Sequence, residues 1–310
     1  MSEIPKERLA VNEHAFTYCG VDYFGPLIIK LNRNVTRRNA ATAKRWVSLM
    51  TCPTTRAVHL ELVHDLTTDC FLLAFRRFTA RRGKPKEMHS DNGTNFVGAI
   101  NVLNDNKLLN SMSNWSIEWK LNPPAAPWMG GIYESMVKIA KKCLRTIVTD
   151  KLFDEESLRT FLTEIESFMN SRPLTSISDD PLDTEVLTPN HFLTGRIITP
   201  KETVPEFEIN AKNRWRKVQA ATSKFWQLWL NHYLPTLTKR LKWFDETRSL
   251  RVNDIVVYVD DTVERQKWPI GRVIEVFPGG DGIVRKVTLK TKTGIYTRPA
   301  AKCYLLEGAE

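Results

Sequence analysis

Apolar residues in the first fifth of the chain fall into three runs rich in β-branched and aromatic side chains. The runs cover residues 16–31, 45–52 and 56–63, and polar or proline-containing segments separate them. Apolar runs of this length, bounded by turn residues, are typical of β-strands. Since each run follows the last across turn-like residues, we expect the three strands to form an antiparallel meander.

Helices and strands are then predicted to alternate. Residues 67–82 predict a helix, because Thr67 can cap it, Asp69 suits its first turn and arginines lie near its end. A strand at 86–90 follows. The other predicted elements are helices around 95–110 and near 132–148 and 154–171, a strand at 115–121, and a Pro/Gly-rich loop at 122–131. This order predicts a mixed α/β sheet covered by helices on both faces.

The pattern changes twice in the second half of the chain. A loop-rich acidic connector leads to a basic and aromatic stretch at 211–238 with helical spacing. From about residue 250, short β-runs alternate with Asp, Pro and Gly turns, which predicts a small all-β barrel. We therefore expect a core at 10–172, a connector with a helical segment at 173–248, and a barrel at 249–310.

Six residues of the basic stretch recur at intervals of three or four, as on one helix face. They are Trp215, Val218, Thr222, Phe225, Trp229 and Tyr233. We interpret them as a buried stripe, because aromatic residues at helical spacing are more often core than a surface for stacking bases. The cations between them are the part that we assign to phosphate contact.

Composition narrows the class of protein. With 310 residues, 42% of them hydrophobic, the chain can build real cores, and its net charge of +10 favours polyanionic partners. The five cysteines are scattered and form no Cys-x-x-Cys pair, which argues against a disulfide framework and a zinc knuckle. No apolar run approaches the ~18 residues of a membrane span, and the first residues do not resemble a signal peptide. We expect an intracellular protein without a membrane partner.

Two aspartates occupy unusual places on predicted strands. Asp22 interrupts the apolar strand "CGVDYFGPLII", and Asp91 ends a short strand and precedes an Asn-Gly turn. A buried lone carboxylate is costly, and a bound cation is one remedy. The alternatives are a strand-end Asp22 satisfied by backbone amides and an Asp91 that merely begins a tight turn.

Glu134 is the third candidate carboxylate. At 100° per residue, Met136, Ile139, Ala140, Cys143 and Ile147 form an apolar stripe on its helix. Glu134 lies on the opposite face with Lys138, Lys141 and Arg145. This face has two interpretations. It is either an ordinary solvated helix surface, or a face on which Glu134 binds a metal ion and the three cations run along a phosphate backbone.

Together, the three carboxylates have a chemical rationale. Magnesium prefers oxygen ligands, and two such ions about 3.5–4 Å apart activate the attacking oxygen and stabilise the leaving oxygen in phosphodiester chemistry. Two aspartates on neighbouring strand ends and a glutamate on a nearby helix can build that site.

Several motifs carry a family resemblance. "GVDYFGP", "HSDNGTNFVGA" and "PPAAPWMGGIYESMVK" resemble the catalytic core of retroviral-type integrases, specifically those of Bel/Pao-type retrotransposons. The resemblance continues through "NSRPLTSISDDPLDTEVLTPNHFLTGR" and "WRKVQAATSKFWQLWLNHYLPTL" to the terminal "WPIGRVIEVFPGG" segment. It therefore covers nearly the whole chain in family order.

The resemblance implies a ribonuclease H-like α/β fold followed by a helical linker and a C-terminal β-barrel. It implies that Asp22, Asp91 and Glu134 are the acidic triad, binding Mg²⁺ or Mn²⁺, with two ions expected. The implied reaction is trimming of the element's 3′ ends and their joining to target DNA. Partners would be double-stranded DNA and further copies of the chain, with no small-molecule substrate. Synthesis as part of a cytoplasmic polyprotein and action in the nucleus follow from the same resemblance.

The expected DNA-contacting residues are Asn92, Trp128, Lys138, Lys141 and Arg145. Two of the family's features differ in this chain. Relatives commonly have Pro-His before the Gly-Gly pair and Trp before the glutamate, where this chain has Trp128 and Tyr133. Trp128 either stacks on a base or packs on the core.

The zinc-binding His/His/Cys/Cys spacing that normally precedes the family's core does not occur in this sequence. This predicts either the C-terminal portion of a longer polyprotein or a truncated copy. Two other functions stay open: a catalytically inactive or domesticated DNA-binding remnant, and a ribonuclease H-type nuclease acting on RNA–DNA hybrids.

Overall fold

The computed structural model describes eleven stretches of the chain. They are residues 7, 9–10, 12–31, 41–103, 117–121, 131–150, 153–176, 186–195, 214–237, 248–259 and 268–309, with the side chains of 131–136 and 150 excluded. The chain divides into two compact units: Met1–Asn170 with Phe192–Gly195 and Glu206–Phe225, and the remainder. The three-segment division predicted from the sequence stays a prediction.

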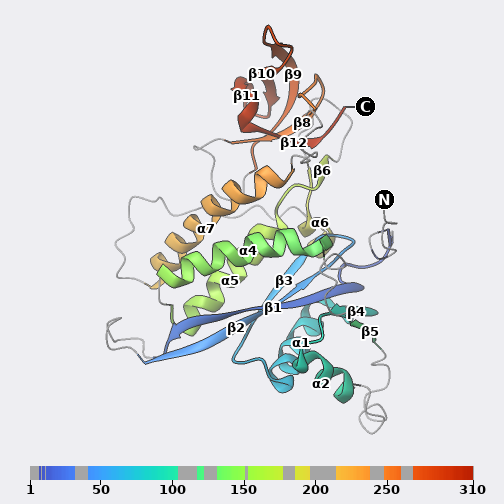
Figure 1. Ribbon diagram of the computed structural model, residues 1–310, viewed down its shortest axis with the longest axis vertical. Coiled ribbons are helices and arrows are strands. Elements are labelled where there is room, and N and C mark those ends of the chain that lie inside the picture. Colours follow the sequence, from blue (N-terminus) through green and yellow to red (C-terminus); the bar gives the residue numbers. More distant parts are fainter. Residues whose placement is uncertain are drawn as a thin grey trace. The chain divides into compact units, whose positions relative to one another are not determined.

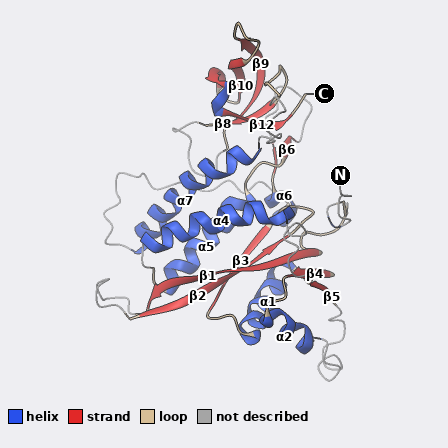
Figure 2. Ribbon diagram, in the orientation of Figure 1, coloured by secondary structure: helices blue, strands red, loops and turns tan. Residues whose placement is uncertain are grey.

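A five-stranded mixed sheet forms the centre of the first unit (Figures 1 and 2). Its strands are β1 (Tyr18–Lys30), β2 (Thr42–Thr51), β3 (Val58–Val63), β4 (Glu87–Ser90) and β5 (Glu118–Leu121). The order is β3-β2-β1-β4-β5. The pairs β1–β2 and β2–β3 are antiparallel, whereas β1–β4 and β4–β5 are parallel. The predicted meander and the ribonuclease H-like mixed sheet are thus confirmed.

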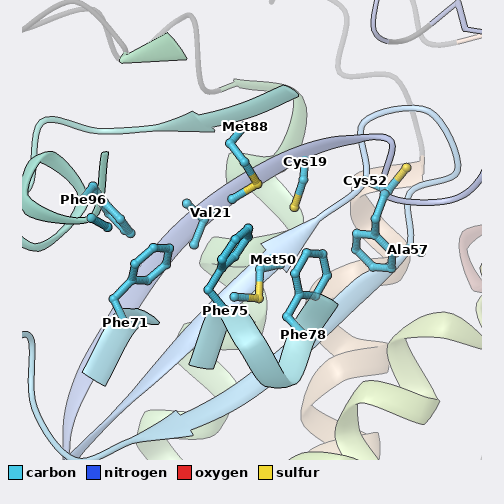
Figure 3. Packing of buried hydrophobic residues seen from close by; sticks show 12 residues of the cluster. Cys19, Val21, Met50, Cys52, Ala57, Phe71, Phe75, Phe78, Met88 and Phe96 are labelled. Carbon is cyan, nitrogen blue, oxygen red and sulfur yellow. The ribbon is translucent and has the colours of Figure 1, made fainter. Parts of the chain in front are cut away.

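Helices α1 (Thr68–Arg82) and α2 (Thr94–Leu103) pack on one face of this sheet. The predicted cap of α1 is present: Thr67 accepts a hydrogen bond from the Cys70 amide, and Asp69 lies in the first turn. Figure 3 shows Phe71, Phe75 and Phe78 of α1 directed at the strands. The buried cluster that they join includes Phe16, Cys19, Val21, Met50, Met88 and Phe96. The part of the predicted 95–110 helix after Leu103 lies outside the described residues.

Helices α4 (Gly131–Asp150) and α5 (Glu155–Asn170) cover the opposite face of the sheet (Figure 1). Ala140, Cys143 and Ile147 of the predicted apolar stripe on α4 are buried. The buried side of α5 includes Phe161, whose ring stacks on Phe153 at 5.2 Å. The sheet therefore has a helical layer on each face, as the sequence predicts.

The outer edge of β3 is capped by side chains of α5. Asn170 accepts a hydrogen bond from the Val58 amide and donates one to the Val58 carbonyl, both at 2.8 Å. Glu166 Oε2 accepts the Leu60 amide at 2.8 Å. His59 lies between Glu166 and Glu61, with its ring nitrogens 3.3 and 3.1 Å from their carboxylates. These contacts satisfy edge-strand groups that otherwise attract another strand.

Helix α7 (Arg214–Leu237) accounts for the basic aromatic stretch. Its first half packs in the first unit, where Arg214 pairs with Asp154 at 2.6 Å and the ring of Phe225 meets that of Phe161. Five of the six stripe residues are buried, as expected: Val218, Thr222, Phe225, Trp229 and Tyr233. Trp215 is 48% exposed, so its assignment to the stripe was wrong. It lies in the first turn, where the helix has only begun to pack.

The second unit contains a separate antiparallel sheet ordered β11-β10-β9-β8-β12. Its strands are β8 (Ile255–Tyr258), β9 (Ile270–Pro278), β10 (Val284–Thr291), β11 (Gly294–Pro299) and β12 (Cys303–Glu307), with the 3₁₀ helix η5 (Ala300–Lys302) before β12. The smaller elements β6 (Thr175–Ser176), β7 (Val186–Leu187) and α6 (Pro189–Thr194) precede it. The predicted C-terminal all-β domain is confirmed. Among the described residues, no helix has the length and apolarity to span a bilayer.

Candidate active site

Asp22 lies in the first half of β1 and is half-buried. Its Oδ1 accepts a hydrogen bond from the Tyr23 amide at 2.6 Å. The register between β1 and β2 shifts between Phe24 and Leu27, so the regular pairing breaks soon after this residue. The Tyr23 amide thus satisfies Asp22 Oδ1, which agrees with the alternative that backbone amides satisfy this carboxylate. Asp22 Oδ2 has a different partner.

Asp91 follows β4 directly and is exposed at the start of the Asn92-Gly93 turn. Its Oδ1 accepts the Gly93 amide at 2.9 Å, which is the hydrogen bond of an Asx turn. A Cβ atom at Gly93 would lie 2.7 Å from Asn95 Oδ1 and 3.1 Å from Asp91 Oδ1, so a larger residue would crowd these two side chains. The turn predicted from the sequence is real, and it fixes the carboxylate at the end of the strand.

The parallel pairing of β1 with β4 runs up to Gly20 and His89, two residues before Asp22 and Asp91. Cys19 pairs with Met88, and both belong to the core on the α1/α2 face. Asp22 comes three residues after Cys19 within β1, so its position falls on the opposite, α4/α5 face, whereas Asp91 lies just beyond the end of β4. Neighbouring strands lie about 4.8 Å apart, so the end of β4 carries Asp91 along the strand next to the one that holds Asp22.

Helix α4 supplies a cation to this pair. Lys141 Nζ lies 2.5 Å from Asp22 Oδ2, and the side chains of Lys141 and Asp22 are 19% and 37% exposed. Lys138 and Arg145 are exposed on the same helix, three residues before and four after Lys141. The three cations therefore occupy one helix face, as the sequence predicts.

Glu134 belongs to α4, seven residues before Lys141, but its side chain lies outside the described part. Two helical turns, about 10 Å of axis, separate the two residues, and the helical period puts them on one face. The structure places Asp22 on β1 and Asp91 directly after the neighbouring strand β4, and the joint role of Asp22, Asp91 and Glu134 as metal ligands stays a prediction. Trp128 also lies outside the described residues, as does the side chain of Tyr133.

Three buried polar side chains near the aspartates in sequence lie on the other, α1/α2 face of the sheet, where the Tyr23 ring contacts those of Phe71 and Phe96. Tyr23 Oη, Ser48 Oγ and Asn95 Nδ2 are buried without a direct hydrogen-bond partner among the described residues. Burial raises the pKa of the Tyr23 hydroxyl. The side chains of Ser48 and Asn95 lie close enough to this hydroxyl to lower its pKa in part. Asn95 also touches the Asp91 turn through Gly93. Ser48 pairs with Tyr23 across β1 and β2, so it shares the face of Tyr23 and not that of Asp22.

A second acidic cluster lies on β4 and near the chain start. One ligand atom each of Glu7, Glu87 and His89 lies within 4.8 Å of the others, a spacing that can hold a metal ion. Lys120 already occupies this cluster, 2.8 Å from Glu87 and 3.8 Å from Glu7. Hydrogen bonds with Lys120 and His89 hold the pKa of Glu87 below its usual value, although its burial acts in the opposite direction. The cluster therefore carries its own neutralising charge.

The Asp22–Asp91 pair fits a hard divalent cation. Its donors are carboxylate oxygens, the ligands that Mg²⁺ and Mn²⁺ take in proteins. The close contact with Lys141 Nζ indicates that Asp22 Oδ2 is accessible to a cation. Cations on the adjacent helix face can neutralise a polyanion that approaches these carboxylates.

Comparisons with known proteins give two kinds of similarity. Residues 213–306 match a protein family of unknown function, DUF5641, and this range covers α7 and most of the C-terminal sheet. No curated protein matches the sequence. A chain of the simian T-cell lymphotropic virus intasome in complex with PP2A regulatory subunit B56 gamma aligns with a TM-score of 0.38 at 10% identity. That alignment covers 94% of this chain and 79% of that chain.

Two structures of the HTLV-2 integrase catalytic core domain in complex with magnesium also align, each with a TM-score of 0.29 at 16% identity. Each alignment covers 44% of this chain, with 74% of the trimeric form and 75% of the dimeric form. The assignment of the ribonuclease H-like fold to this chain rests on its own strand order.

Proposed function

We propose that this chain is a Bel/Pao-type retrotransposon integrase, which trims the 3′ ends of element DNA and joins them to target DNA. The observation that carries the proposal is the place of Asp22 on β1 and of Asp91 just after the parallel neighbour β4, with Lys141 from the basic face of α4 in contact with Asp22. The ordered acidic motifs of the sequence support it independently.

In this proposal, Asp22, Asp91 and Glu134 hold two Mg²⁺ or Mn²⁺ ions. The ions, when bound, activate the attacking oxygen and stabilise the leaving oxygen. Lys138, Lys141 and Arg145 neutralise the phosphates that flank the reacting one. Asn92 and Trp128 contact the DNA from the turn after β4 and from the 122–131 loop.

The two reactions differ only in the attacking group. In trimming, a water oxygen bonds to phosphorus, the bond from phosphorus to the 3′ oxygen breaks, and the water loses a proton. In joining, the freed 3′ hydroxyl oxygen attacks a target phosphorus, loses its proton, and the target's 3′ oxygen leaves. Copies of the chain would act together on two DNA ends, on chromosomal DNA in the nucleus.

The test is strand transfer of a short element-end duplex in Mn²⁺. We expect Asp22→Asn, Asp91→Asn and Glu134→Gln each to lower the rate by more than about 100-fold, since even outer partners of metal ligands contribute about 10–100-fold. Glu156→Gln is the matched control, because Glu156 is exposed on α5, away from the site. Each variant must melt like the parent.

Two outcomes would favour the other functions. If the parent and all variants are equally inert but bind DNA, a DNA-binding remnant is the better account. If the parent cleaves RNA–DNA hybrids and does not join DNA, the ribonuclease H-type nuclease is favoured.

A further inference from the structure

The contact between Lys141 and Asp22 has a consequence for how ligands bind. We propose that Lys141 is a positioning residue that exchanges between two anions. It pairs with Asp22 before the metal arrives, and with a DNA phosphate afterwards. Metal and DNA then bind cooperatively. This inference rests on the proposed function, because it takes Asp22 as a metal ligand and DNA as the polyanion.

The charges around the pair explain why Lys141 stays beside Asp22. Asp22 lies on β1 and Asp91 directly after the neighbouring parallel strand β4, so their negative charges repel each other. Lys141 Nζ, at 2.5 Å from Asp22 Oδ2, offsets one of these charges. Only 19% of the Lys141 side chain is exposed, so water screens this contact less than it would a surface pair.

The same oxygen cannot serve both cations well. Asp22 Oδ1 is taken by the Tyr23 amide, which leaves Oδ2 as the oxygen for a cation. A magnesium ion lies about 2.0–2.1 Å from its ligand oxygens. An ammonium group 2.5 Å from that oxygen would then face a divalent ion at close range. Metal binding at Asp22 therefore requires Lys141 to withdraw.

Lys141 needs a new anion once it withdraws. Lysine carries a compact charge on a flexible four-carbon stem, which lets its ammonium group move while the helix stays in place. Lys138 and Arg145 are exposed on the same face and mark the path of a phosphate backbone. DNA on this face supplies the phosphate, so the cost of releasing Lys141 from Asp22 is smaller when DNA is bound.

Thermodynamic linkage turns this exchange into a measurable quantity. If DNA raises the affinity for metal by some factor, metal must raise the affinity for DNA by the same factor. We expect about tenfold for the parent, inside the usual range of about 5–150-fold for such coupling. Without the Lys141 charge, the metal displaces nothing, so the coupling factor should fall to the part that comes from DNA phosphate oxygens that bind the metal directly.

The experiment measures Mn²⁺ binding from the electron paramagnetic resonance signal of the free ion, with and without a short DNA duplex. Duplex alone is the reference for ions held by DNA. In Lys141→Met, we expect Mn²⁺ to bind about tenfold more tightly than in the parent without DNA, with a clearly smaller further gain from DNA than the parent shows. Lys141→Arg keeps the charge and should keep most of the coupling.

Lys142→Met is the matched control, because it removes one charge from the next, exposed position of α4. It should behave like the parent. The inference is wrong if Lys141→Met binds Mn²⁺ no more tightly than Lys142→Met, or if its coupling to DNA is undiminished. Asp22→Asn separates this result from failure of the proposed function: if Asp22→Asn binds Mn²⁺ as the parent does, the metal site itself is elsewhere. Thermal melting of every variant checks its folding.

Discussion

Replacing Asn170 by alanine should destabilise the first unit by opening the edge of its sheet. Asn170 is 1% exposed at the end of α5, and its amide group makes both hydrogen bonds to the Val58 backbone. Val58 is itself fully buried. The alanine side chain would leave one buried N–H and one buried C=O without partners.

The magnitude follows from these two groups. An unpaired buried polar group costs about 1–3 kcal/mol, so two groups give a loss of about 2–6 kcal/mol in the free energy of unfolding. Domains are stable by only about 5–15 kcal/mol, so the loss is a large share. The bared edge of β3 should also promote strand pairing between molecules, seen as association that increases with protein concentration.

Urea unfolding followed by circular dichroism measures the loss, and light scattering measures the association. Asn101→Ala is the matched control, because Asn101 is exposed on α2. It should change the free energy of unfolding by less than about 0.5 kcal/mol, as surface substitutions usually do. A loss below about 1 kcal/mol in Asn170→Ala would refute the reasoning, because each unpaired group alone should cost that much.

Two other predictions concern buried charge. Burial lowers the pKa of His59, but Glu166 and Glu61 outweigh it and raise the pKa above its usual value. The stability from this contact is fully present below the unfolded pKa of about 6.5 and is lost as pH rises through the folded pKa. Between pH 6 and 8.5, urea unfolding should therefore show a smaller stability loss in His59→Gln than in the parent; equal losses would contradict this. Asp254 is fully buried and accepts the Arg251 and Ala309 amides and the Arg248 guanidinium. Asp254→Ala should cost about 3–5 kcal/mol and speed amide exchange in β8 and β12, but not in β1, with a smaller effect for Asp254→Asn.

Local patterns predicted most of the elements. The three apolar runs became β1, β2 and β3, and the Thr67 cap and the Asp91 turn are present as expected. Each depends on residues close together in sequence, so turn and cap chemistry suffices to predict it. The exposed Trp215 shows the limit, because spacing alone does not tell where a helix begins to pack.

Contacts between distant segments could not be read from the sequence. Asn170 lies in a motif that carries the family resemblance. Its side chain nevertheless caps β3 at Val58, 112 residues away in sequence. Lys141 was expected to follow a phosphate backbone, but it contacts Asp22 directly. Both depend on how α4 and α5 dock on the sheet, which helical period alone does not determine.

The most direct test of the proposed site is to locate Mn²⁺ by anomalous diffraction in crystals of this protein. We predict an ion within about 2.5 Å of carboxylate oxygens of both Asp22 and Asp91, with Lys141 Nζ moved away from Asp22. An ion bound only at the Glu7, Glu87 and His89 cluster, or none beside Asp22 at saturating Mn²⁺, would contradict the account.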